Sequence, residues 1–210
     1  IALLSGSRLP EACENMAILL DLAIEIAREF AIAPIQPIQF RAAVVPKLMK
    51  IGVNGKTPLE EVAIQQGWQC SSNGKLYHIQ SNVTIICACD AFADILQQSN
   101  LVVGMAGTAI EQAVGLGKPV VQIPGRGPQF TYRFAEAQMR LLGQSVQTIG
   151  TQPADPQTLV AAAQQIKRTL ADSAYLHQCV QNGLERVGTP GGSAQMADYL
   201  AELIGVNQSS

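Results

Sequence analysis

Ile1-Ala-Leu-Leu-Ser-Gly-Ser-Arg-Leu-Pro-Glu11 begins the chain in the order of a buried strand, a tight turn and a helix start. We expect the strand over 1–5 and the helix over 10–30, where apolar residues recur at helical spacing. Gly6 lets the backbone turn sharply and come close to a ligand. Ser7 can cap the helix that follows. This order predicts the first unit of an α/β domain.

Short apolar runs alternate with helical patterns along the rest of the chain, which is typical of a parallel sheet covered by helices. Further strands are expected within 38–45, 83–87, 101–104, 119–123 and 145–149, and further helices after Thr57 and over 91–98, 108–116, 132–142, 156–170, 173–186 and 193–204. Asn73-Gly74 also predicts a small hairpin within 68–79.

Six strands in this rhythm predict a Rossmann-like α/β fold, a doubly wound parallel sheet with helices on both faces. The expected strand order is 3-2-1-4-5-6. In this order a crevice opens between strands 1 and 4 at their carboxyl ends. The turns that follow these two strands should therefore face the same ligand.

The composition fits one buried core and excludes several partners. The chain has 210 residues, of which 48% are hydrophobic and 14% charged, enough for one sizeable domain. Lys and Arg total 14 against 16 Asp and Glu, a formal charge of −2, so we expect no nucleic acid partner and see no polybasic segment for a lipid surface. Apolar stretches end before the roughly 20 residues of a membrane-spanning helix. We expect a cytoplasmic protein with no transmembrane segment.

The five cysteines are odd in number and scattered along the chain. Cys87 and Cys89 form a lone C-x-C motif in a chain with two histidines, so buried, reduced thiols explain them better than a metal site. We expect no metal and no other cofactor. Because Ile1 begins within a buried strand, we also expect 1–210 to be one domain of a longer two-domain protein, closed by the helices within 156–204.

The turn after the fourth strand, Gly104-Met-Ala-Gly-Thr-Ala-Ile-Glu111, contains two glycines and two small residues that let the backbone meet a ligand. Thr108-x-x-Glu111 matches a capping box, in which the glutamate bonds the start of its own helix. Alternatively, Glu111 accepts hydrogen bonds from both hydroxyls of a ribose, because its two oxygens are acceptors at a suitable separation. The residues alone leave both interpretations open.

Two arginines lie where the crevice is expected. Arg8 follows the first turn, where the exposed N–H groups of a helix start can hold an anion such as a diphosphate. Arg126 lies in the Gly- and Pro-rich loop 124–130, which either supplies a cation to phosphate or serves only to turn the chain. The patterns G-x-G-x-x-G, the P-loop and G-x-S-x-G are absent, which disfavours NAD enzymes, P-loop NTPases and the commonest hydrolases.

The two turns together resemble the C-terminal half of the bacterial lipid-A-disaccharide synthases and the related synthase-like proteins. That family has a leucine-rich strand ending in Pro-Gly-Ser-Arg and a downstream Ser-Gly-Thr-Ala segment with a helix glutamate. The resemblance covers 1–142. Ser5 stands where the family has Pro, Ala106 stands where it has Ser, and the family's Pro-Asn signature is missing after the fifth strand.

The resemblance implies a GT-B glycosyltransferase with two Rossmann-like domains, in which the C-terminal domain holds a UDP-sugar without an obligatory metal. The expected function is the donor-binding domain of an enzyme that transfers an amino sugar to a lipid or sugar acceptor. The general base is expected on the N-terminal domain, so this chain alone should transfer no sugar. A lipid acceptor would place the full-length protein peripherally at the inner membrane.

The resemblance also implies that the first turn lies near the diphosphate and the second on phosphate and ribose. The candidate nucleotide-sugar-binding residues are Gly6, Ser7, Arg8, Gly104, Ala106, Gly107, Thr108, Glu111 and Arg126. Two alternatives remain. One is a UDP-GlcNAc 2-epimerase-like enzyme of the same architecture, and the other is a degenerate nucleotide-binding or regulatory domain without catalysis.

Overall fold

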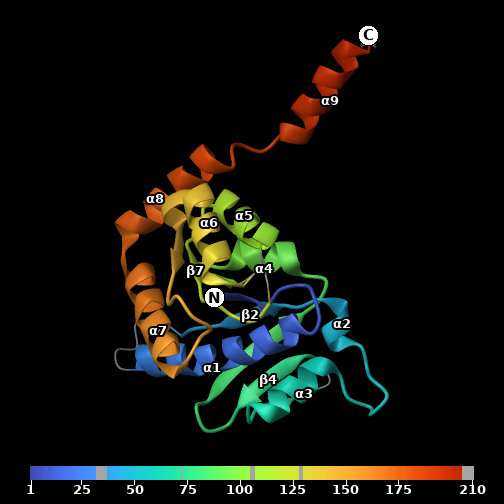
Figure 1. Cartoon of the computed structure of the whole chain (residues 1–210), viewed down its shortest axis with the longest axis vertical. Helices are drawn as coiled ribbons and strands as arrows, with labels where there is room; N and C mark the ends of the chain where they lie inside the picture. Colours follow the sequence, from blue (N-terminus) through green and yellow to red (C-terminus); the bar gives the residue numbers. More distant parts are fainter. Residues whose placement is uncertain (32–36, 72, 105–106, 128–129, 205–210) are drawn as a thin grey trace.

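The computed structural model describes residues 1–31, 37–71, 73–104, 107–127 and 130–204. Strands and helices alternate along these residues (Figure 1). The strands are β1 (Ala2–Leu4), β2 (Phe40–Ala43), β3 (Gln69–Cys70), β4 (Lys75–His78), β5 (Val83–Ala88), β6 (Val102–Gly104), β7 (Val120–Gln122) and β8 (Val146–Thr148). The helices are α1 (Glu11–Ala31), α2 (Pro46–Met49), α3 (Pro58–Gln65), α4 (Phe92–Gln98), α5 (Gly107–Gly115), α6 (Tyr132–Leu142), α7 (Pro156–Ala171), α8 (Ser173–Arg186) and α9 (Gly192–Leu203), with a 3₁₀ turn at Gly143–Ser145.

The strands form one sheet in the order β3-β4-β5-β2-β1-β6-β7-β8. From β5 to β8 all neighbours are parallel, and these six strands have the order 3-2-1-4-5-6 that the sequence predicts. The expected hairpin is present as β3 and β4, and β4 pairs antiparallel with β5. The sheet of the described residues therefore has eight strands rather than about six, because the hairpin extends the edge at β5.

Helices cover both faces of the sheet, as expected for a Rossmann-like fold (Figure 1). The side chains of β1 alternate, so that Leu3 packs in the core with α1, α3 and α7, while Ala2 and Leu4 pack in the core with α4 and α5. This alternation follows from the two-residue period of a strand. Because both faces are buried, β1 has an uninterrupted apolar sequence.

Local sequence signals explain where the helices begin. The Thr57 hydroxyl accepts from the Glu60 N–H at 3.1 Å and the Thr57 N–H donates to the Glu60 carboxylate at 2.7 Å, a capping box that starts α3 at Pro58. The Asp155 carboxylate caps α7 through the Thr158 N–H at 2.7 Å. Helix α1 begins at Glu11, so Ser7 lies ahead of the helix and is not its cap.

Helix α9 has no buried residue and extends away from the sheet and its other helices (Figure 1). Met196, Tyr199, Leu200 and Leu203 are each at least half exposed, and their i, i+3, i+4, i+7 spacing places them on one face. The closing helices are therefore not equivalent, since α7 packs against α1 while α9 presents an uncovered apolar face. None of the described helices is long and apolar enough to cross a membrane.

Candidate functional site

A cleft of about 530 Å³ opens at the carboxyl ends of β1 and β6. The first turn contributes Gly6, Ser7 and Arg8, and the start of α5 contributes Gly107, Thr108 and Glu111. Further walls come from α1, from the chain after β2 and β5, and from three aromatic side chains; these lining residues include Glu11, Val44, Val45, Pro46, Cys89, Phe92, Phe130 and Phe134. The two turns that the sequence singles out thus meet in one cleft.

Gly6 has to be a glycine for two reasons. Its φ of +96° is a conformation that residues with a side chain rarely adopt. A Cβ atom at this position would also lie 2.9 Å from Cζ of Phe130. The ring of Phe130 therefore lies against the first turn, in the space that a side chain at Gly6 would need.

The start of α5 presents the first residues of a helix to the cleft. The first N–H groups of an α-helix have no partner within it and carry the positive end of its dipole. The Gln138 side chain fixes this end, since its amide donates to the Gly107 carbonyl at 3.0 Å and its carbonyl accepts from Gln122. Ala106, a further candidate, lies outside the described residues.

The capping box at Thr108 and Glu111 is not formed. Because α5 begins at Gly107, Thr108 already lies within the helix, and among the described residues no hydrogen bond joins the Thr108 hydroxyl to Glu111. The Glu111 side chain instead lines the cleft. Of the two interpretations open from the sequence, the structure leaves Glu111 available to a ligand.

Two candidates lie outside the cleft. Gly104 is buried beneath it, where a Cβ atom would overlap Cδ1 of Ile110 and contact Leu4 at 3.6 Å. Its lack of a side chain therefore serves the packing of β1, β6 and α5. Arg126 is exposed and is not among the lining residues, so Arg8 supplies the cation of the cleft, as far as its described lining goes.

Asn15, which the sequence did not single out, holds two loops beside the cleft without lining it. It is fully buried on α1, and its amide bonds the Ser5 carbonyl at 3.4 Å and the Arg126 carbonyl at 3.5 Å. Its side-chain carbonyl accepts from the Arg126 N–H at 3.0 Å. Asn15 thus ties the turn after β1 to the loop after β7. The available signal was a polar residue within the apolar stripe of α1, between Ala12 and Met16.

The sulfur atoms near the cleft carry no metal-binding arrangement. Burial raises the pKa of the Cys87 thiol to about 12, and the hydrogen bond to the Asp90 carboxylate raises the pKa of Cys89. Both thiols are therefore protonated near neutral pH. Within the described part of the chain, no group of three or more His, Cys, Asp or Glu side chains is placed to hold a metal ion.

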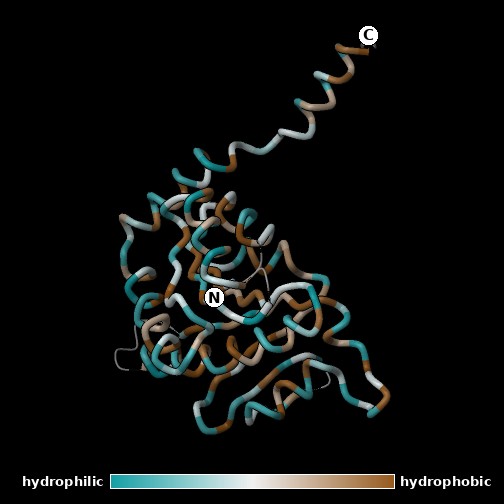
Figure 2. The backbone as a smooth tube through the Cα atoms, in the orientation of Figure 1, coloured by the Kyte–Doolittle hydropathy of each residue, from teal (hydrophilic) through white to brown (hydrophobic). Residues whose placement is uncertain are grey.

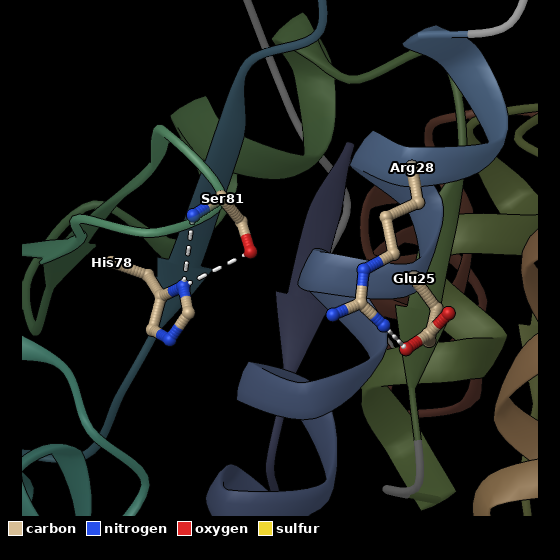
Figure 3. Close-up of polar contacts among 4 residues, drawn as sticks. All are labelled: Glu25, Arg28, His78 and Ser81. Atoms are coloured by element: carbon tan, nitrogen blue, oxygen red, sulfur yellow. Dashed lines mark hydrogen bonds and ion pairs between the residues drawn. The ribbon is translucent and has the colours of Figure 1, made fainter.

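The two histidines lie away from the cleft and have structural partners. The Nδ1 atom of His78 lies 3.1 Å from the Ser81 hydroxyl and accepts from the Ser81 N–H at 3.3 Å (Figure 3). The ring of His78 also packs on Trp68, with 5.3 Å between centroids. His177 is exposed on α8, with Nδ1 at 2.7 Å from the Ser173 carbonyl. Neither histidine lines the described cleft. The titratable residues in its described lining are Arg8, Glu11, Glu111 and Cys89.

Comparison with known proteins relates the chain to others through its fold. No protein-family model matches the sequence, and no curated protein matches it. Among solved structures, the chain is similar to a protein from Listeria monocytogenes assigned as a UDP-N-acetylglucosamine 2-epimerase, with 16% identity and a TM-score of 0.54. It is also similar to MnaA from S. aureus in complex with UDP, with 14% identity and a TM-score of 0.52.

A third similar structure is the UDP-GlcNAc 2-epimerase from Neisseria meningitidis bound to UDP-GlcNAc, with 14% identity and a TM-score of 0.53. The matches include 99%, 100% and 96% of this chain but 46%, 47% and 44% of the respective neighbours. The chain thus spans less than half the length of these proteins. At such identities the likeness establishes the Rossmann-like fold.

Replacing Asn15 with Ala should lower the free energy of unfolding by about 1–3 kcal/mol, because the buried Ser5 carbonyl and the part-buried Arg126 N–H lose their partner. Urea denaturation measures this change. Asn100→Ala is a matched control at an exposed position and should change stability by less than about 0.5 kcal/mol. Equal effects of the two substitutions would show that the Asn15 bridge does not stabilise the loops.

Proposed function

We propose that this chain is the nucleotide-sugar-binding unit of a UDP-sugar enzyme. The observation that carries the proposal is the meeting of two glycine-containing turns, after β1 and β6, in one cleft with an arginine and a helix start. A nucleoside diphosphate needs both a close backbone approach and positive charge. The three similar structures support the choice of ligand, since one contains UDP and another UDP-GlcNAc.

The diphosphate is proposed to lie between the Gly6 turn and the first turn of α5. The free N–H groups and the positive dipole end of α5 favour an anion. Arg8, an exposed residue in the lining of the cleft, adds a cation there. These groups supply the positive charge without a metal, so we propose that donor binding requires no metal or other cofactor.

The nucleoside is proposed to lie toward Glu111 and the aromatic wall. A carboxylate can accept a hydrogen bond from each hydroxyl of a ribose. Phe92, Phe130 and Phe134 offer apolar, planar surfaces to a base or a sugar ring. Gly104 and Arg126 take no part in this arrangement, because neither lines the cleft.

The reaction favoured by the similar structures is a UDP-GlcNAc 2-epimerase-like conversion. Such catalysis needs titratable groups at the sugar, and the described part of this cleft offers Glu11 and Glu111 but no histidine. Transfer of an amino sugar to an acceptor is the second candidate, favoured by the motif residues Gly6 to Arg8 and Gly107 to Glu111 in the cleft. In transfer the diphosphate leaves with negative charge, which Arg8 and the start of α5 would stabilise.

Either reaction is proposed to require a second domain. The chain spans 44–47% of the three similar proteins. Helix α9 also presents an apolar face that nothing in the described chain covers. We infer that a further domain supplies the remaining catalytic groups and that the isolated chain binds the donor without turning it over.

Glu111→Gln should weaken UDP binding by about 10-fold or more, because a hydrogen bond to a charged group contributes about 1.5–3 kcal/mol. Binding of dUDP, which has one hydroxyl fewer, should weaken much less. Calorimetry with both ligands measures the difference, and Glu136→Gln, whose carboxylate pairs with Arg140 on α6, is the control. Absence of heat from the unmodified chain up to millimolar UDP would support the non-binding alternative instead.

Arg8→Ala should weaken UDP binding by about tenfold, or 1.4 kcal/mol, and leave uridine binding nearly unchanged, because the arginine is proposed to contact the diphosphate alone. Arg168→Ala, at an exposed position on α7, removes the same charge away from the cleft. Titration of each variant with UDP and with uridine provides the comparison. If UDP and uridine lose affinity equally, Arg8 does not act on the phosphates.

Incubation of the full-length protein with UDP-GlcNAc separates the two reactions. Epimerisation needs no acceptor, so we expect a change of sugar configuration that proton NMR detects in the donor alone. Under the transfer hypothesis the donor stays unchanged until an acceptor is added. Steady turnover of the donor by the isolated 210-residue chain would contradict the need for a second domain.

A further inference from the structure

The loop between α2 and α3 carries the most exposed large apolar side chain among the described residues. Val53 is 111% exposed relative to its reference value, and Ile51 is 69% exposed. We call these two residues the apolar tip. The loop projects away from the sheet at the end of α2 (Figure 1), and its outer part is coloured as hydrophobic in Figure 2. Apolar residues at the end of a projecting loop are outside any core of this domain.

The loop has a defined shape that keeps the apolar tip in solvent. The Gly52 N–H donates to the Lys56 carbonyl at 2.8 Å and the Gly55 N–H donates to the Gly52 carbonyl at 3.1 Å. At its base, Leu48 of α2 is fully buried, and the Thr57 capping box fixes the start of α3. Both ends of the loop are therefore anchored in the domain while its middle is exposed.

Exposed lysines flank the apolar tip along the chain. Lys47, Lys50 and Lys56 are exposed and are three of the six lysines of the chain, and 46–57 contains no Asp or Glu. The nearest carboxylates along the chain, Glu60 and Glu61, are half-buried and bond the Thr57 N–H and the Asn54 side chain. Three lysines over ten residues do not form a polybasic run, but all three are exposed and lie close to the apolar tip in the sequence.

We propose that the loop 46–57 docks this chain on an anionic lipid surface, with the apolar tip entering the headgroup region and the three lysines contacting acidic headgroups. An exposed apolar tip flanked by exposed lysines matches both components of such a surface. The uncovered face of α9 does not, because its charged residues are Asp198 and Glu202, which an anionic surface repels.

Docking by this loop brings the cleft to the lipid surface. Helix α2 begins at Pro46, and both Val45 and Pro46 line the cleft. The mouth of the cleft and the loop therefore lie at the same edge of the sheet. This inference uses none of the residues proposed to bind UDP, so it can hold or fail independently of the proposed function.

The test is flotation of the 210-residue chain with vesicles of phosphatidylcholine containing about one third phosphatidylglycerol, against vesicles of phosphatidylcholine alone. We expect binding to the anionic vesicles that decreases with salt, because salt screens exposed charges. Each cation near an anionic surface strengthens partitioning about fivefold. Replacing Lys47, Lys50 and Lys56 with Gln should therefore weaken partitioning about 100-fold. The double variant Ile51→Ser with Val53→Ser should weaken it at least about tenfold.

Matched controls separate the loop from other surfaces. A control variant loses the same charge from other helices. It replaces three exposed arginines, Arg133, Arg168 and Arg186, with Gln. This variant should keep most of the binding. Met196→Ser with Leu203→Ser tests α9, and circular dichroism confirms folding of each variant. The proposal is overturned if the unmodified chain does not float with the anionic vesicles, or if it binds neutral vesicles equally well. It is also overturned if the α9 variant loses flotation while the loop variants keep it.

Discussion

The parallel pairing of β1 with β6 is the constraint on which the site depends. Leu4 pairs with Gly104 at the ends of the two strands, so both chains leave the sheet at the same edge. Each then enters a helix, and the two following turns lie on the two sides of one crevice. Gly104 makes this pairing close-packed, because the Ile110 side chain occupies the space that its own side chain would need.

The order of the strands was predictable because each signal was local and repeated. Apolar runs bounded by glycine turns and followed by 3.6-residue periodicity indicate βα units without any knowledge of long-range contacts. The general rule for doubly wound sheets then places the turns after β1 and β6 together. The hairpin at Asn73-Gly74 was equally visible, but its place at the β5 edge was not, since sequence signals for turns do not identify a strand's neighbours.

The parts of the site that sequence could not predict are those set by tertiary packing. Asn15 bonds the backbone of Arg126, far away along the chain, and belongs to no motif. Gln138 bonds the carbonyl of Gly107, a contact that its place in the sequence does not indicate. The capping box failed for a related reason. Thr108 and Glu111 have the sequence pattern of a capping box. However, α5 begins at Gly107, so Thr108 lies inside the helix and cannot be its cap. Arg126 does not line the described cleft, and its backbone N–H and carbonyl bond Asn15 on α1.

The described lining of the cleft contains one arginine and two glutamates. This excess of negative charge limits where an anionic ligand could bind. A diphosphate bound beside Glu11 and Glu111 would be repelled unless the N–H groups of α5 and Arg8 offset both carboxylates. Among the described lining residues, Gly6 and Gly107 are the glycines that would let the backbone approach a diphosphate. The carboxylates then lie where hydroxyl groups, which donate hydrogen bonds, are better partners than phosphate. Under the proposed function, this charge pattern would orient a nucleotide sugar in the cleft, with its diphosphate at the glycines and its hydroxyls at the glutamates.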